Sequence, residues 1–172
     1  MNRNVTVLSI CALALLGAGG ARAQGQRQPP TPAQSIRGVF AGLNKEILDM
    51  AKDFPADKYD FRPTKEVRSF AEVMVHIASG NVFGAKAGRG EKVNWDELDP
   101  RNYKTKAEVV ALMQKSVDDA TATLAATPDE KFSATLGPWL SVIEHDAEHF
   151  GLLAAYYRLN GLVPPQSRPK AK

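Results

Sequence analysis

Cysteine is almost absent from this sequence. The single cysteine, Cys11, lies in an apolar stretch near the N-terminus, and no other occurs in the remaining chain. The part of the chain after that stretch therefore has no disulfide, thiolate metal site, iron–sulfur cluster or cysteine nucleophile. Histidine is scarce as well, with three residues among 172. The positions of those three histidines are therefore informative.

A strong excess of charge is also missing. The formal net charge is +3, and leaving out Arg3 and Arg22 of the N-terminal stretch lowers it to +1. A protein that neutralises nucleic-acid phosphates carries a larger excess of basic residues, gathered on one face. We therefore expect no nucleic-acid partner. The 44% of hydrophobic and 24% of charged residues are typical of a globular domain.

Residues 1–23 show the features of a secretory signal peptide in their usual order. Arg3 supplies the positive charge, residues 5–16 are apolar, and Ala21-Arg22-Ala23 is a small-residue cleavage site. The uncharged run there is 18 residues long, so a retained membrane anchor is the alternative. We expect cleavage before Gln24, a periplasmic or secreted protein, and no stable membrane span after cleavage.

The expected mature chain divides into a linker, one domain and a short tail. Residues 24–33 contain three prolines and predict a flexible linker. Residues 34–165 are enough for one domain and too few for two cores. Residues 166–172 are basic and are predicted to form a disordered tail.

Four amphipathic helices are predicted within that domain, and no strand. Apolar residues recur at steps of three and four along each helix, and Pro, Gly or a capping box marks its ends. The fold class is therefore an all-α four-helix bundle. The expected helices cover about residues 36–54, run from Ser69 and from Thr105, and extend from Pro138 to Asn160.

A long loop is predicted between the second and third helices. Gly84, Gly88 and Gly90 are expected to end the second helix and to begin this loop, which runs to about Tyr103. Its length would suit a lid, but a plain surface loop is the simpler interpretation. Trp95 within it is expected to be a packing residue, as are Tyr103 and Trp139.

The three histidines are predicted to lie on apolar helix faces. His145 and His149 are four residues apart, so their side chains share one face of the fourth helix. Helical steps from His149 reach Leu153 and Tyr156, which indicates that this face points into the bundle. His76 lies on an apolar face of the second helix in the same way.

Three inward imidazoles admit two interpretations. Each could be a core residue that finds its own hydrogen-bond partner. Burying three costs several kcal/mol unless each is partnered. One divalent ion bound by His76, His145 and His149 satisfies all three and leaves a position open, as in catalytic zinc sites. We therefore predict a metal site, for which zinc and nickel are the first candidates.

The motifs around these histidines resemble those of the DinB-like family. The segment from His145 through Glu148 and His149 to Gly151 is similar to the closing signature of that family. The upstream segments 59–63 and 75–78 match as well. The resemblance covers about residues 36–165, and one departure is Leu152, where many members have glutamine.

The resemblance implies a fold and a ligand set. The expected fold is an up-down-down-up bundle, and the expected ligands of its divalent metal are His76, His145 and His149. Some relatives are metal-dependent thiol transferases or isomerases, whereas many have no known activity. The thiol cofactors of those relatives are cytosolic, which disfavours thiol transfer for an exported member.

Three functions stay open at this stage. A metal-dependent enzyme of the transferase or hydrolase type, acting on an unknown small molecule, could use Glu144, Asp146 or Glu148 as a base, unless these are solvated carboxylates. A non-catalytic metal- or ligand-binding module is the alternative. A peptidase is disfavoured, because the H-x-x-E-H spacing ending at His149 lacks a downstream acidic ligand.

Two further expectations concern the surroundings of the metal site and the assembly. Asn81 lies about one turn beyond His76 and is the best candidate to support a metal ligand from the second helix. A homodimer is an open possibility beside the monomer.

Overall fold

The computed structural model describes residues 28–169 of the chain. Within this range lie four α-helices and four short 3₁₀ helices, and there is no strand. The predicted signal peptide and the last three residues of the predicted tail lie outside the described residues. No helix in the described part combines the length and apolar composition that a membrane span requires.

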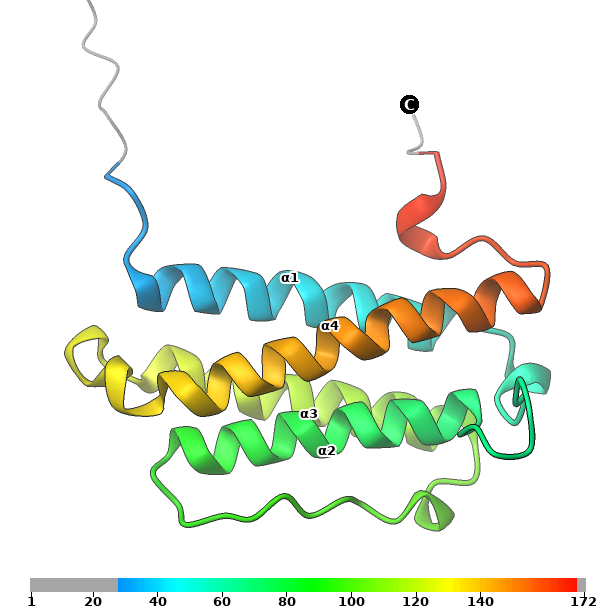
Figure 1. The fold of residues 1–172 in the computed structure, drawn as a ribbon, viewed down its shortest axis with the longest axis horizontal. Coiled ribbons are helices and arrows are strands. Elements are labelled where there is room, and N and C mark those ends of the chain that lie inside the picture. Colours follow the sequence, from blue (N-terminus) through cyan, green and yellow to red (C-terminus); the bar gives the residue numbers. More distant parts are fainter. Residues whose placement is uncertain (1–27, 170–172) are drawn as a thin grey trace, which may run out of the picture.

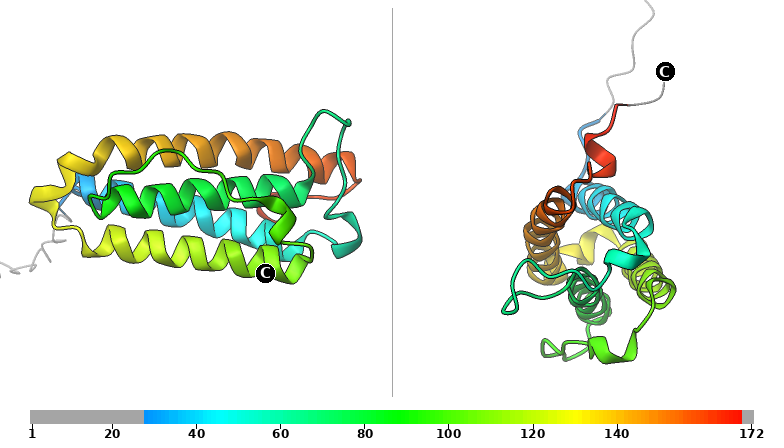
Figure 2. Two further views of the ribbon diagram at one scale, coloured as in Figure 1. Left: turned by 90° about the horizontal axis from the view of Figure 1, so that it is seen from below. Right: turned by 90° about the vertical axis from the view of Figure 1, so that its right-hand side faces the viewer.

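The four long helices form an up-down-down-up bundle. Helices α1 and α4 run in one direction, and α2 and α3 run in the other (Figure 1). Both α1 and α2 contact α3 and α4, so the four helices surround one core, as the end-on view shows (Figure 2). The expected fold class and topology are confirmed. The bounds are Pro32–Asp53 for α1, Phe70–Gly88 for α2, Lys106–Ala126 for α3 and Leu136–Leu159 for α4.

Local hydrogen bonds start three of these helices. The capping boxes predicted at Ser69 and Thr105 both form. A further capping box pairs Thr31 with Gln34 and places Pro32 in the first turn of α1. Helix α1 therefore begins inside the segment 24–33 that the sequence indicated as a linker.

The first residues of the predicted tail pack back onto the bundle. A 3₁₀ helix spans Pro165–Ser167, and Arg168 Nη1 then donates to Asp53 Oδ1 at 2.8 Å. Arg168 Nε also donates to the Val163 carbonyl at 3.0 Å. Arg168, within the segment 166–172 that its composition predicts to be a disordered tail, thus contacts α1.

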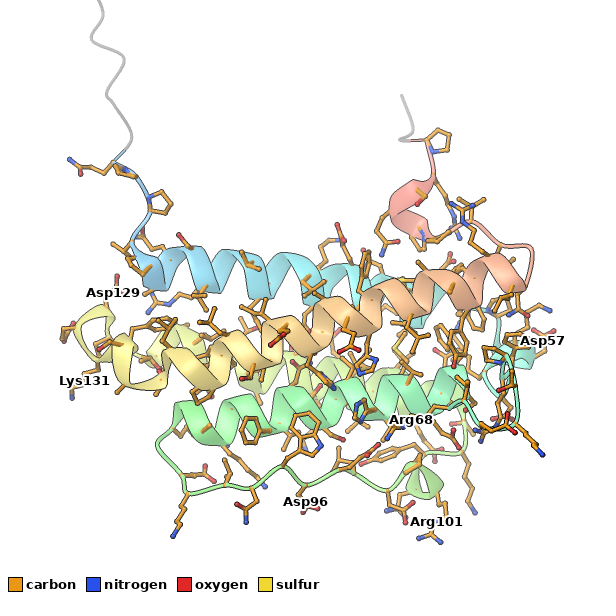
Figure 3. All side chains as sticks on the ribbon, in the orientation of Figure 1. Asp57, Arg68, Asp96, Arg101, Asp129 and Lys131 are labelled. Carbon is orange, nitrogen blue, oxygen red and sulfur yellow. The ribbon has the colours of Figure 1, made fainter. Side chains whose placement is uncertain are left out.

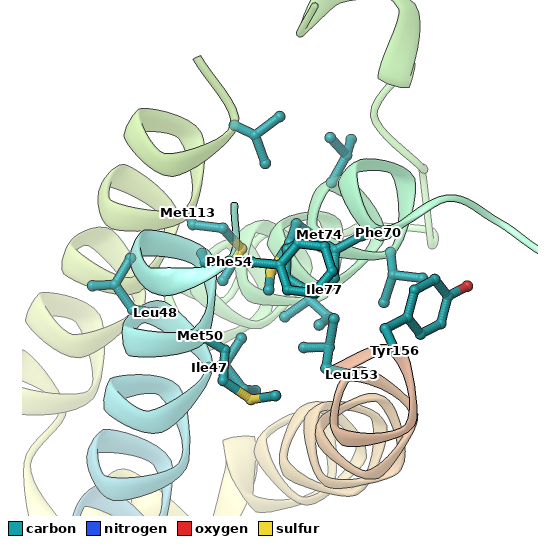
Figure 4. Close-up of a cluster of buried hydrophobic side chains, with 14 of the residues drawn as sticks. Ile47, Leu48, Met50, Phe54, Phe70, Met74, Ile77, Met113, Leu153 and Tyr156 are labelled. Atoms are coloured by element: carbon teal, nitrogen blue, oxygen red, sulfur yellow. The ribbon is translucent and has the colours of Figure 1, made fainter. Parts of the chain in front are cut away.

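Two apolar clusters fill the core. In the larger cluster the rings of Phe54 and Phe70 stack with their centroids 3.8 Å apart. In the smaller cluster Phe40 packs edge-on against the fully buried Trp139 at 5.6 Å. Figure 4 shows part of the larger cluster: Ile47, Leu48, Met50, Phe54, Phe70, Met74, Ile77, Met113, Leu153 and Tyr156.

A buried polar layer separates the two clusters. Each long helix contributes a buried polar residue that lies along the chain between members of the smaller and the larger cluster. In α1, for example, Asn44 lies between Phe40 and Ile47, and its side chain is fully buried. We use the name polar layer for Asn44, Asn81, Ser116 and Asp146.

Three glycines of α2 bring it close to α4. A Cβ atom at Gly84 would lie 2.9 Å from Val142 Cγ2, and one at Gly88 would lie 2.7 Å from Trp139 Cζ2. Gly80, one turn earlier, faces His145. Gly84 lies within α2, so the interpretation of this glycine as the start of a loop is wrong, whereas Gly88 is the last residue of α2 and ends the helix as expected. At both positions the absence of a side chain makes room for α4.

Candidate metal centre

Three histidines from two helices meet between α2 and α4. The centroid of the His76 ring lies 4.7 Å from that of His145 and 4.8 Å from that of His149, and the last two are 4.5 Å apart. One ring nitrogen from each histidine lies within 4.8 Å of the other two. The residues selected by spacing thus form one histidine cluster.

Each imidazole of the histidine cluster has a buried nitrogen without a hydrogen-bond partner. These atoms are Nδ1 of His76, Nε2 of His145 and Nδ1 of His149. Most buried polar atoms in proteins are paired, and an unpaired one costs free energy. Three such imidazoles, with one ring nitrogen of each within 4.8 Å of the other two, fit a single cation, because neutral imidazole is a common ligand of divalent metals.

The other nitrogen of the His145 ring is held from within the bundle. His145 Nδ1 lies 3.3 Å from Asp146 Oδ1, and the Asp146 side chain is fully buried. Burial raises the pKa of the Asp146 carboxyl, opposed by its hydrogen bonds to His145 and Asn44. Asp146 is thus a buried partner of His145 and not a solvated carboxylate, which the sequence had left open.

The polar layer continues from Asp146 to α1 and α2. Asn44 Nδ2 donates to Asp146 Oδ2 at 2.8 Å, and Asn81 Nδ2 donates to Asn44 Oδ1 at 2.9 Å. Asn81, the predicted supporting residue, is therefore connected to His145 through two intervening side chains. Asn44 was missed because a lone polar residue on an apolar helix face has no recognisable sequence signal.

Gly80 makes room for the His145 ring. A Cβ atom there would lie 2.9 Å from His145 Nδ1 and 3.2 Å from Trp95 Cη2. Both distances are shorter than nearly all contacts of a real Cβ. A side chain at this position would displace the imidazole, so the glycine is part of the site.

The loop between α2 and α3 forms the outer edge of the histidine cluster. Its ribbon runs along α2 for the length of the bundle (Figures 1 and 2). The Trp95 ring lies 5.0 Å from the His145 ring and 5.8 Å from the His76 ring, and 44% of the residue is exposed. Trp95 thus covers the site, whereas Trp139, as expected, packs in the core.

A charged pair lies beside Trp95. Glu97 Oε1 is 3.1 Å from His76 Nδ1, although the two are not aligned for a hydrogen bond. Glu97 Oε2 also pairs with Arg68 Nη2 at 3.0 Å. Figure 3 shows the Arg68 side chain beside α2, on the side along which the loop runs. Nothing in the sequence connected these two residues with the histidines.

The remaining carboxylates on α4 point away from the cluster. Glu144 and Glu148 are both exposed. Each follows or precedes a histidine directly, and one residue turns a helix by about 100°. Among the described acidic residues, Glu97 is the one that combines solvent exposure with contact to a histidine of the cluster.

Burial favours the neutral form of two of these imidazoles, those of His149 and His76. It lowers the pKa of His149 to about 4, and the neighbouring His145, His76 and Arg68 lower it further in the same direction. Burial likewise lowers the pKa of His76, with help from Arg68, while Glu97 opposes the shift. Neutral imidazole is the form that binds a metal.

The metal-free protein is expected to lose stability as the pH falls from about 6.5 towards 4. In this range a histidine of the unfolded chain binds a proton and His149 of the folded chain does not. Protonation therefore stabilises the unfolded state, and the free energy of unfolding falls. Because the ring is only half-buried, we expect a loss of about 1–2 kcal/mol.

Urea unfolding between pH 7 and pH 4 in the presence of a chelator measures this dependence. His149→Gln is the comparison variant, since glutamine does not titrate and should flatten the curve. Equal slopes for wild type and variant would contradict the expectation.

Comparisons with known proteins place this chain in a family. No curated protein matches it. A family model described as the DinB superfamily matches residues 40–156, a range that includes all three histidines. Since that match covers more than half of the chain, and the fold is the four-helix bundle described above, the protein belongs to the DinB superfamily.

Proposed function

We propose that this chain is an exported protein that binds one divalent metal ion through His76, His145 and His149. The observation that carries the proposal is the histidine cluster, in which one ring nitrogen of each imidazole lies within 4.8 Å of the other two and each imidazole has a buried nitrogen without a partner. Zinc bonds imidazole nitrogen at about 2.0–2.1 Å. Nitrogens within 4.8 Å of one another need to move by less than about an ångström each to reach that spacing.

Metal content after dialysis tests the binding. The metal-free protein is dialysed against zinc or nickel, and the bound metal is measured per chain. We expect one ion per chain for wild type and none for His76→Ala. Glu148→Gln is the matched control, because Glu148 lies beside a ligand but is exposed. Equal metal content in wild type and His76→Ala would overturn the proposal.

The geometry favours a metal-dependent enzyme of the transferase or hydrolase type. His76, His145 and His149 would hold the divalent ion, which would supply a Lewis acid with an open position for a ligand. Glu97 is placed to accept a proton from a substrate at its Oε1, with Arg68 holding the carboxylate in position. Trp95 shields the same side from solvent.

A substrate screen with wild type and Glu97→Gln tests this role. We expect metal-dependent turnover that the substitution lowers by about 10²–10⁴-fold without loss of bound metal. Full metal loading without turnover of any ester, amide or transferable group would favour the alternative, a non-catalytic binding module. That alternative is supported by the exposed positions of Glu144 and Glu148, which leave α4 without a base.

Export is expected to remove residues 1–23. Expression of the full chain in a bacterium with an intact secretion system should yield a periplasmic or secreted protein that begins at or near Gln24. N-terminal sequencing of that fraction measures the cleavage. Soluble cytosolic protein with an intact Met1 would refute export, and a membrane-bound chain with the same intact end would support the anchor instead.

A further inference from the structure

We propose that Asp146, Asn44 and Asn81 are positioning residues that hold His145 in the tautomer and orientation needed to bind a metal. The inference rests on the proposed metal site but concerns residues outside the ligand set. Metal-ligating histidines commonly donate their second ring N–H to a carboxylate, which fixes the ring and raises its basicity. Asp146 occupies that place beside His145.

The neighbours of Asn44 determine the orientation of its side-chain amide. Asn44 Nδ2 faces two acceptors, the Phe40 carbonyl at 3.3 Å and Asp146 Oδ2 at 2.8 Å. Asn44 Oδ1 accepts from Asn81 at 2.9 Å. Flipping the Asn44 amide would place oxygen against oxygen, so its NH₂ group must face Asp146.

In its ionised form Asp146 has no proton to donate and accepts at both of its oxygens. With Oδ2 occupied by Asn44, Oδ1 is left for His145 Nδ1, which then carries the ring proton. A neutral imidazole protonated at Nδ1 has its lone pair on Nε2. Nε2 of His145 is the buried nitrogen that lacks a partner in the histidine cluster. The polar layer and the cluster thus require the same tautomer.

The burial of these groups is costly for stability alone. Asn44, Asn81 and Asp146 have no solvent exposure and come from three different helices. Apolar side chains of similar volume would join the two apolar clusters and avoid the desolvation of a carboxyl and two amides. The polar layer instead contacts the site, at His145 alone among the three histidines.

Asp146→Asn tests the proposal through zinc affinity. An asparagine at this position turns one of the two acceptors into a donor, so either Asn44 or His145 loses its hydrogen bond. Zinc affinity, measured by competition with a chromophoric chelator, is expected to fall by about 10–100-fold. Ser116→Ala is the matched control, because Ser116 belongs to the polar layer but bonds only its own helix at Met113. It should bind zinc as wild type does.

The ring tautomer gives a second readout that needs no metal. Nitrogen-15 NMR of the metal-free wild type is expected to show His145 protonated at Nδ1. In Asp146→Asn the Nε2-protonated form should appear, which a loss of packing alone would not cause. Since the wild-type tautomer is measured without any substitution, the test holds even if that variant does not fold.

A double substitution should restore what the single one removes. In Asn44→Asp with Asp146→Asn, the new carboxylate accepts from Asn81 and from the new amide, while the 3.3 Å hydrogen bond to the Phe40 carbonyl is lost. The oxygen of that amide then accepts from His145. We expect at least a tenfold recovery of zinc affinity over Asp146→Asn and a return of the Nδ1-protonated form.

The outcomes separate this inference from the metal proposal. Failure of the wild type to bind zinc would overturn the proposed function. It would also overturn the inference that Asp146 positions His145 for metal binding. Wild-type zinc binding with an Nε2-protonated His145 in the metal-free protein would overturn the positioning role alone. So would equal zinc affinity for Asp146→Asn and Ser116→Ala.

Discussion

Chelation is expected to lower the melting temperature of the wild-type protein and to leave that of His149→Ala unchanged. A metal that binds only the folded state stabilises it by about 2.7 kcal/mol at a hundred times its Kd. For a domain of this size that corresponds to about 5–10 °C. Removing one of three ligands weakens the metal affinity so far that His149→Ala binds no metal under these conditions. A chelator then has no metal to remove from this variant.

Thermal unfolding at pH 7.5, with and without chelator, measures this difference. Glu148→Gln serves as control and should keep the full chelator effect, since its side chain is exposed. His149→Ala should still fold, because the two apolar clusters involve all four helices and include none of the histidines. No metal-linked shift in wild type after loading with zinc, nickel or copper would identify the histidines as core residues.

Gly84→Leu is expected to destabilise the bundle by about 3 kcal/mol. Even a Cβ atom at this position would lie 2.9 Å from Val142 and 3.0 Å from Trp139, both of which are buried. Overpacking of this kind costs typically 1–3 kcal/mol and sometimes more. The gain in helix propensity, about 0.8 kcal/mol, is smaller.

Gly42→Leu is the matched control for this substitution. A Cβ at Gly42, within α1, meets no atom within 4 Å, so the same change there should stabilise by up to about 0.8 kcal/mol. Urea unfolding measures the change in the free energy of unfolding for both variants, which is expected to be negative for Gly84→Leu and positive for Gly42→Leu. Because Gly84 sets the approach of α2 to α4, its substitution should also weaken the chelator effect. A neutral or stabilising Gly84→Leu would show that α2 and α4 can separate without cost.

Helix positions and the histidine pair were predictable because their signals are local. Capping boxes at Ser69 and Thr105 involve residues three apart, and the spacing of His145 and His149 is one helical turn. Local periodicity does not predict burial reliably for residues at the edge of the apolar face of a helix. Val39 and Leu140 each have apolar residues three and four positions away in the sequence, yet they are 52% and 49% exposed.

The surroundings of the site depended on contacts between helices. A glycine such as Gly84 has a low helix propensity, so the local sequence favours a helix end there. In the folded protein Trp139 of α4 packs against Gly84, and α2 extends past it to Gly88. From the sequence alone Asp146 could be a solvated surface carboxylate. In the structure it is buried, and Asn44 of α1 donates a hydrogen bond to it.

The sequence by itself thus determined the four helices, the family resemblance and the choice of three histidines. The tertiary structure decided which groups surround those histidines. Trp95 and Glu97 reach the histidine cluster through the course of a loop, and no periodic pattern constrains such a course. Asn44 reaches Asp146, the partner of His145, across the bundle from 102 positions away in the chain. Contacts between residues so far apart arise when helix packing closes the core, and a single sequence carries no local record of them.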